Sequence, residues 1–344
     1  MTSGRSWTRA APWLLLVVTA LSFARLWFVE YSWDDEALVK DNQLTGSLAN
    51  LPELFVRDLW STTRLPTLKS GYYRPLLLLS LAVDRAAFGL SSTFAHVHSL
   101  AWHLLAVWGL YGLLRRLLTP DEDTTTTGPA LGSIELRALL GATVFALHPV
   151  QSEVLALVAA RNDSMAAAFT VLALWILCSR TVSGGKLVGA GVLAFLGLLS
   201  KESAVLVPLL LLALDLARWG RPVGWRRYAS LGAALAAYVG LRIAVDVGGE
   251  LVPDEGNWAL VGRHAAQVLG VYGSLVVWPW PLTPARHVHY LPHLGNTLLG
   301  LLVCLGLLGW LWARGPRKRL VLAGLVWAGL SFAPTLAATL DKGL

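Results

Sequence analysis

The sequence predicts an all-α polytopic membrane protein, and three observations lead to this fold class. Apolar residues make up 55% of the 344 residues and charged residues only 14%, whereas soluble domains carry about 25% charged residues. The mean hydropathy is +0.58. The apolar residues form continuous runs and do not alternate, which favours helices over barrel strands in a bilayer. We expect a bundle of about nine transmembrane helices, each needing roughly 20 apolar residues, with further interfacial helices on the outer side.

Nine apolar runs are the candidate spans. Several are short for a free span, which predicts broken helices that line a cavity. The first run follows RSWTRAAPW and has no small-residue cleavage site before Arg25, so we interpret it as an uncleaved span and not as a signal peptide. The nine runs are Pro12–Val29, Phe94–Leu118, Leu136–Leu147, Ser164–Ser179, Leu187–Leu199, Ser203–Leu216, Tyr228–Val245, Leu294–Trp312 and Leu320–Leu336.

Basic residues predict the orientation of the chain. If the N-terminus lies inside, every inner loop carries Arg or Lys, as the positive-inside rule requires. The net charge of +7 is then a topology signal, and no nucleic-acid partner is expected. The inner clusters are Arg5 and Arg9, Arg115 and Arg116, Arg180 and Lys186, Arg218 to Arg227, and Arg314 to Arg319.

Two further apolar segments fit the outer interface better than a span. Tyr72–Leu90 carries Asp84 and Arg85, and Trp258–Trp278 carries Arg263 and His264. Counting either segment as a span would place the RGPRKR cluster outside. We therefore expect both to lie along the outer surface of the membrane.

This topology gathers charged and polar side chains at the outer ends of the helices. Charges at membrane depth are costly and persist mainly where they face a cavity or one another, so these residues predict one outward-facing polar pocket. A carboxylate can accept the proton of an incoming hydroxyl, and Arg or Lys can neutralise a leaving phosphate. Sugar transfer from a lipid-linked phosphosugar needs both. The residues are Asp34, Asp35, Arg74, His148, Glu153, Arg161, Asp163, Lys201 and Glu202.

Structural roles are the alternative for each of these residues. Asp34 and Asp35 could cap a helix starting near Glu36, and His148 before Pro149 could be a helix-end residue. The acids and the arginine of SEVLALVAARND could form a structural ion-pair set. Lys201 and Glu202 of SKES could be ordinary anchors at the membrane interface. No metal or other cofactor is expected, because His287, His289 and His293 have loose ligand spacing and lack a nearby carboxylate or Cys.

Several motifs occur in an order that resembles a known family. They are WDDEALVKDN, YYRPLLLLS, HSLAWHLLAVWGLYGLL, FALHPVQSEVLALVAARNDSMAAAF and LLSKESAVLVPLLLLALDL. This succession is similar to the membrane domain of the transmembrane and tetratricopeptide-repeat O-mannosyltransferases and their bacterial relatives. More broadly it resembles GT-C glycosyltransferases, which include protein O-mannosyltransferases and lipid A aminoarabinose transferases. The similarity is strongest from Trp33 to Asp215 and thin after Tyr228.

The resemblance implies a polyprenyl-phosphate-linked sugar donor, a protein or glycan acceptor, and an essential acidic motif in the outer loop 30–74. Asp34 and Asp35 match that motif, with Asp34 the first choice as base. Arg74 matches the basic residue of the YRP element, and Arg161 and Lys201 match positions expected to bind phosphate. The chain ends at DKGL, where relatives continue. We therefore expect residues 1–344 to form one transmembrane domain that further spans or a repeat domain would follow.

Two other function classes stay open at this point. A transporter or flippase for a lipid-linked or anionic solute would also want buried cations and broken helices. A noncatalytic membrane scaffold could keep the fold of an enzyme family. For the enzyme, we expect an integral protein of the inner membrane if the source is bacterial, with its active site on the periplasmic or lumenal side.

Overall fold

The computed structural model describes residues 3–63, 70–120, 131–247 and 318–341, together with a few single positions between 270 and 302. All regular elements in these ranges are helices, so the all-α prediction is confirmed for the described chain. The chain divides into two compact units. One comprises Met1–Leu211 and Val223–Gly249, and the other comprises Leu212–Pro222 and Glu250–Leu344.

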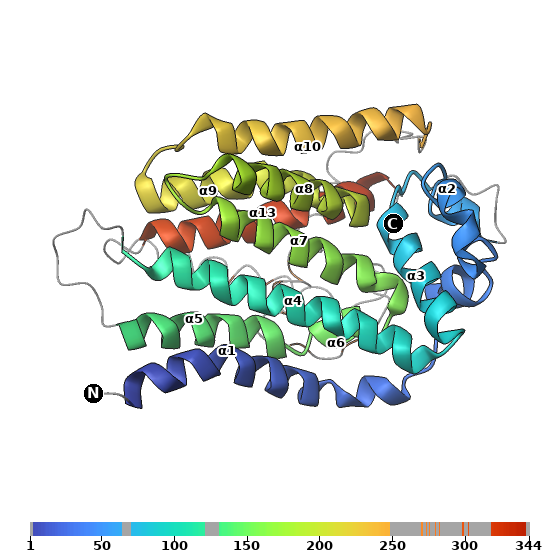
Figure 1. The fold of residues 1–344 in the computed structure, drawn as a ribbon, viewed down its shortest axis with the longest axis horizontal. Coiled ribbons are helices and arrows are strands. Elements are labelled where there is room, and N and C mark those ends of the chain that lie inside the picture. The colour runs from blue at the N-terminus through green and yellow to red at the C-terminus, as the bar shows by residue number, and fades with distance from the viewer. Residues whose placement is uncertain are drawn as a thin grey trace. The chain divides into compact units, whose positions relative to one another are not determined.

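Long helices build the first unit, and six of them pack side by side in the order α1, α5, α4, α7, α8 and α10 (Figure 1). A seventh, α3, begins with Pro75 at its first turn, where a missing N–H costs nothing. It ends at Gly89, whose φ of 66° is the left-handed conformation that favours glycine. The helices are α1 (Ser3–Ser22), α3 (Pro75–Phe88), α4 (Ser92–Leu118), α5 (Leu131–Leu147), α7 (Arg161–Leu177), α8 (Gly184–Ser200) and α10 (Trp225–Ala244).

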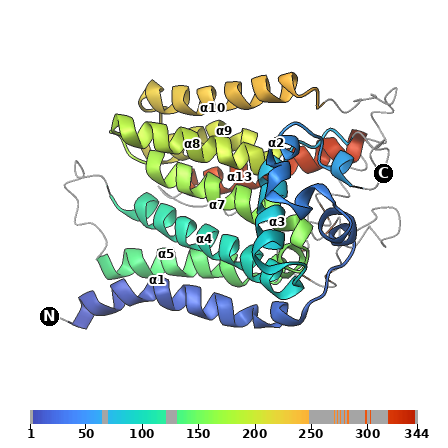
Figure 2. The same ribbon diagram turned by 45° about the vertical axis from the view of Figure 1, so that its right-hand side comes forward.

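The predicted outer loop is a folded subdomain of short helical turns. Its buried apolar residues, among them Leu38 and Leu54, pack against Leu77 and Leu81 of α3. Arg85 of α3 donates to the carbonyl of Asn42 at 3.0 Å. Figure 2 shows α3 at a steep angle to the long helices, beside these turns. The turns of this loop are η2 (Glu36–Lys40), η3 (Leu44–Gly46), η4 (Leu48–Asn50), α2 (Leu51–Leu54) and η5 (Trp60–Thr62), and η1 (Ala24–Phe28) precedes it at the end of the first predicted span.

Shorter elements complete the described chain. Between α5 and α7 lie α6 (Gln151–Leu155) and η6 (Val158–Ala160), and η7 (Glu202–Leu206) follows α8. Helix α9 (Val207–Trp219) begins in the first unit and continues into the second. The second unit also contains α13 (Lys318–Asp341).

Eight of the nine predicted spans coincide with described helices, and Leu294–Trp312 lies almost wholly outside the described residues. Two stretches in the described chain are long and apolar enough to cross a membrane, Ala10–Phe28 and Ser92–Leu118. All eight helices match the predicted positions, and their crossing of a bilayer stays a prediction. The same holds for the interfacial placement of α3, while Trp258–Trp278 lies largely outside the described part.

The close packing of α4 against α7 gives a first testable prediction. A Cβ added at Gly112 would lie 2.5 Å from Cε2 of Trp175, so the indole ring occupies the space of the missing side chain. We expect Gly112→Ala to destabilise the protein by about 1–3 kcal/mol through overpacking. Thermal unfolding in detergent measures this.

Gly232→Ala on α10 is the matched control. Nothing lies within 4 Å of the Cβ that it would add, so no overpacking follows. A helical Gly→Ala change without a clash is neutral or favourable. Equal melting temperatures for the two variants would contradict tight packing between α4 and α7.

Candidate active site

The acidic pair Asp34–Asp35 sits in a sharp turn that sends its two side chains to different environments. Trp33 has φ of 53°, a left-handed conformation that is strained for a residue with a bulky side chain. The following amides close the turn, since Asp35 N–H donates to Ser32 at 3.0 Å. As a result Asp34 is exposed and Asp35 is fully buried, with 0% of its surface accessible.

Asp35 links the first loop to the segment that precedes α7. Its carboxylate accepts the backbone N–H of Ala159 at 2.7 Å and that of Val158 at 3.2 Å, both in η6. Burial raises the pKa of Asp35, and these backbone hydrogen bonds oppose the shift. Asp35 stands at the N-cap position of η2 but makes no side-chain cap bond there. Its carboxylate therefore caps a different helix from the one that the sequence suggested.

Asp34 is the carboxylate of the pair that faces solvent. The protein packed around it still removes part of its hydration, and this desolvation raises the pKa of Asp34 above its usual value of 3.8. A raised carboxyl pKa suits proton transfer, because the group then binds a proton more readily than a free carboxylate does.

The cation Lys201 pairs with Asp163 across the ends of two helices. Lys201 is the C-cap of α8 and Asp163 lies in the first turn of α7. Nζ of Lys201 lies 2.5 Å from Oδ1 of Asp163, and the two side chains are 28% and 40% exposed. An ammonium has three donors, so Lys201 can contact Asp163 and a ligand at the same time.

Glu202, the residue after Lys201, forms a second ion pair with Arg74 of the YRP element. Its Oε2 accepts from Nε and Nη2 of Arg74, each at 3.0 Å, and its Oε1 accepts the N–H of Tyr73 at 3.1 Å. From α10, Nη2 of Arg242 donates to the carbonyl of Gly71 at 2.6 Å. The segment before α3 is thus held from two sides, and Arg74 contacts the residue that directly follows Lys201.

Arg161 has a different environment from the other predicted cations. Its side chain is 0% exposed and forms an ion pair with Asp84 at 2.6 Å. It also donates to Ser99 Oγ and Ser80 Oγ, each at 3.0 Å, and to the carbonyl of Ala95 at 2.8 Å. This network joins the start of α7 to α3 and α4. In this arrangement the guanidinium of Arg161 is buried among side chains and a backbone carbonyl of α3 and α4.

Asp84 extends this network toward the surface. Its Oδ1 lies 2.6 Å from Nδ1 of His98, and the indole N–H of Trp102 donates to Nε2 of the same imidazole at 3.1 Å. The partner of Arg161 is therefore also the orienting group of a half-buried histidine.

Two further predicted residues, His148 and Glu153, lie between the end of α5 and the start of α7. His148 accepts the N–H of Val150 on Nδ1 at 3.3 Å, which caps the turn after α5. Glu153 is half-buried in α6. The three histidines of ARHVHYLPHL lie outside the described residues, as does Asp254.

The structure brings four predicted residues together, Asp163 with Lys201 and Arg74 with Glu202. Sequence reasoning missed Asp84 as the partner of Arg161 and Arg242 as a contact of the 71–74 segment. Both carried a usable signal, because each is a charge within a mostly apolar stretch, and such charges mostly find a partner.

Comparisons with known proteins agree with the sequence motifs. The chain is 28% identical over 187 residues to the human protein O-mannosyl-transferase TMTC2. It is 27% identical over 180 residues to Tmtc1 of Drosophila melanogaster and 27% identical over 175 residues to human TMTC4. These alignments cover 52%, 52% and 48% of this chain.

The aligned region corresponds to only 20%, 19% and 23% of those three relatives. No protein-family model and no solved structure matches the chain. Over about half of its length, the chain resembles the TMTC protein O-mannosyltransferases.

Proposed function

We propose that this protein is a membrane glycosyltransferase of the GT-C type. It moves a sugar from a polyprenyl-phosphate donor to a hydroxyl of a protein or glycan on the outer face of the membrane. The observation that carries the proposal is the turn at Trp33, which exposes Asp34 and fixes Asp35 on η6, just before the helix that presents Asp163 to Lys201. The names of the relatives favour mannose as the sugar.

In the proposed reaction the acceptor hydroxyl oxygen attacks the anomeric carbon of the donor sugar. Its proton passes to the carboxylate of Asp34 as the new glycosidic bond forms. The bond between the anomeric carbon and the phosphate oxygen breaks, and polyprenyl phosphate leaves with an added negative charge. Lys201 neutralises that charge, and Arg74 supports it from its position against Glu202.

The other residues position this chemistry. Asp35 ties the acidic turn to η6, and Arg161 holds the start of α7 through Asp84. Glu202 and Arg242 fix the segment that carries Arg74. His148 and Glu153 remain proposed contributors to substrate binding at the outer end of α5 and in α6.

A transfer assay with the purified chain in lipid vesicles tests this function. The donor carries a labelled sugar, and the products are separated into glycosylated acceptor, intact donor moved across the bilayer, and unchanged donor. The transferase proposal expects label in the acceptor. Movement of intact donor across the bilayer without transfer would support a flippase. Donor that is neither transferred nor moved would support a scaffold.

Lys201→Met tests the phosphate-binding role. A hydrogen bond to a charged group contributes about 1.5–3 kcal/mol, so we expect donor binding to weaken by about 10- to 100-fold. Binding of a fluorescent polyprenyl-phosphate sugar measures this. Lys186→Met is the control, because this exposed lysine lies in the first turn at the opposite end of the same helix. If both variants lost affinity equally, a general charge effect would replace the proposed site.

A further inference from the structure

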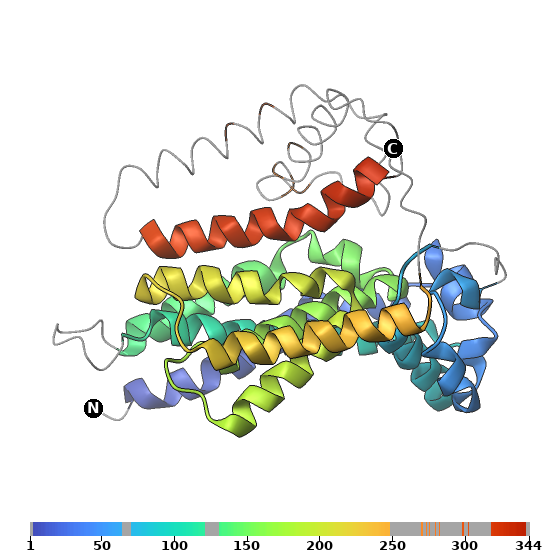
Figure 3. The same cartoon turned by 90° about the horizontal axis from the view of Figure 1, so that it is seen from above.

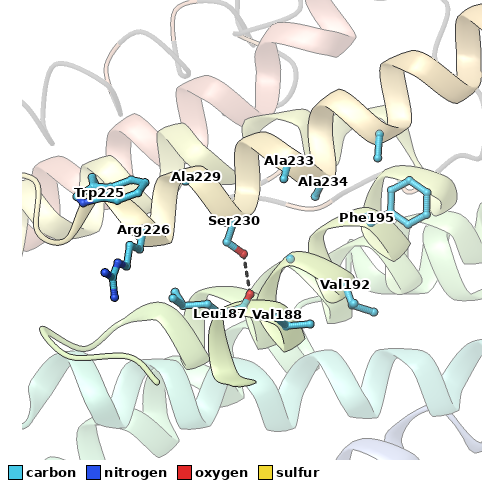
Figure 4. A pocket seen from close by; sticks show the side chains of 12 residues that line it. Leu187, Val188, Val192, Phe195, Trp225, Arg226, Ala229, Ser230, Ala233 and Ala234 are labelled. Atoms are coloured by element: carbon cyan, nitrogen blue, oxygen red, sulfur yellow. Dashed lines mark hydrogen bonds between the residues drawn. The ribbon is translucent and has the colours of Figure 1, made fainter. Parts of the chain in front are cut away.

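A groove runs between α8 and α10 in the first unit. It has a volume of about 570 Å³ and is lined by apolar side chains from one face of each helix, with Arg226 at one end. Figure 4 shows Trp225 and Arg226 beside Leu187 at one end and Phe195 at the other. The volume falls within the range of about 300–1,000 Å³ that is usual for ligand pockets.

The shape of the groove follows from how closely the two helices approach. Ser230 Oγ donates to the carbonyl of Leu187 at 2.6 Å, and a Cβ at Gly191 would lie 2.8 Å from that hydroxyl. Seen from above, α10 lies over α8 and crosses it at an angle (Figure 3). Small residues of α10, including Ala233 and Ala237, leave space beside this contact. The groove is therefore a fixed feature of the packing.

Two adjacent arginines at the start of α10 behave differently. Arg227 is buried and donates to the carbonyls of Leu177 at 2.7 Å and Val223 at 2.8 Å, so it holds the helix in place. Arg226 is exposed, lies 5.9 Å from the ring of Trp225, and reaches the end of the groove. Exposed Lys186 lies in the first turn of α8, next to the lining residue Leu187.

We infer that this groove binds one anionic phospholipid of the inner leaflet, with an acyl chain between α8 and α10 and the headgroup phosphate on Arg226. An apolar wall suits a hydrocarbon chain, and a guanidinium can hold a phosphate through two parallel hydrogen bonds. Basic pockets between helices on the cytoplasmic side are typical sites for anionic headgroups. The predicted topology places Arg226 on that side.

The charge distribution favours this occupant over the lipid tail of the sugar donor. The proposed donor phosphate lies at Lys201, and the 17 residues of α8 separate its two ends by roughly 25 Å at 1.5 Å per residue. The cation at the groove is at the opposite end of α8 from Lys201. A phospholipid there is a separate ligand, and the inference does not depend on the proposed transferase activity.

Photolabelling tests the lipid site with the full chain reconstituted in phosphatidylcholine nanodiscs. One sample contains phosphatidylglycerol with a photoreactive acyl chain, and the other contains phosphatidylcholine with the same chain. We expect the anionic probe to label peptides 187–195 and 225–237 about fivefold more strongly, since one arginine near a membrane surface contributes about that factor. Arg226→Gln should reduce this labelling to the level of the neutral probe.

Two matched controls separate the groove from general effects. Arg137→Gln removes an exposed arginine from α5 and should leave the labelling unchanged. Ala233→Phe fills the groove and should lower labelling by both probes, whereas Ala236→Phe, on an exposed position of α10 that does not line it, should not.

Four results would overturn the lipid site. Equal labelling by the two probes, or no effect of Arg226→Gln, would mean that bulk lipid fills the groove. Displacement of the label by polyprenyl phosphate but not by unlabelled phosphatidylglycerol would assign the groove to the donor tail. Labelling of the groove by cross-linkers from a second copy of the chain would assign it to a protein contact.

Discussion

Asp34→Asn is expected to lower the rate of sugar transfer by about 10²- to 10⁴-fold while the protein keeps its fold. A decrease of this size is typical of the loss of a positioned general base. Asn preserves the shape of the side chain, and Asp34 is exposed, so the packing around the turn does not change. Initial rates with a labelled polyprenyl-phosphate sugar, together with thermal unfolding of the same preparation, measure both parts.

The neighbouring carboxylates are the controls for this substitution. Asp35→Asn removes the charge that binds the amides of Val158 and Ala159, so it should lower the melting temperature as well as the rate. Glu36→Gln removes an exposed charge paired with Lys40 and should change neither much. Near-normal transfer by Asp34→Asn with an inactive, fully stable Asp35→Asn would move the base one residue along.

The pH dependence of the rate follows from the same group. Desolvation raises the pKa of Asp34, and a general base must be ionised to work. As the pH falls through this raised pKa, Asp34 becomes protonated and transfer is lost. The acid limb of the profile should therefore lie above the usual carboxyl pKa of 3.8, and Asp34→Asn should flatten it.

Arg161→Met should have the largest effect on stability. It leaves Asp84, whose side chain is 10% exposed, without its ion-pair partner, and removing one member of a buried pair costs about 3–5 kcal/mol. Denaturant-induced unfolding in detergent measures the change. Transfer should fall too, because Arg161 directly follows the turn that binds Asp35.

Two comparisons make this result specific to the buried pair. Arg57→Met breaks an exposed ion pair with Glu53 and should cost less than about 1 kcal/mol. The double variant Asp84→Asn with Arg161→Met removes both charges, so it should be more stable than Arg161→Met alone. A double variant less stable than Arg161→Met would show that the charge of Asp84 stabilises the protein even without Arg161.

Apolar runs were sufficient to place the helices. Pro75 and Gly89 mark the ends of α3. Eight predicted spans coincide with described helices, because a helix pairs the backbone N–H and C=O groups within an apolar segment. Lengths and ends differ by several residues, as for the span predicted from Leu136, whose helix α5 begins at Leu131. Hydropathy marks only the apolar part of a helix, so it misses a first turn that contains polar residues.

Charge pairing was harder to predict. Arg74 and Glu202 are 128 residues apart in sequence, and no local pattern specifies that contact. Arg161 and Lys201 were expected to share a phosphate, but the described structure buries Arg161 against Asp84 and leaves Lys201 beside Asp163. Which of two adjacent carboxylates turns inward depends on the left-handed φ of Trp33, which a bulky residue rarely adopts and which sequence does not indicate.

Sided transfer in sealed, right-side-out membrane vesicles tests the central claim most directly. The vesicles carry the protein and a labelled polyprenyl-phosphate mannose, and acceptor proteins and glycans that cannot cross the membrane are added outside. The proposed outer site predicts labelled acceptor in intact vesicles and almost none with Asp34→Asn. Labelled acceptor only after the vesicles are permeabilised, or equal amounts with Asp34→Asn, would contradict a transferase that uses Asp34 on the outer face.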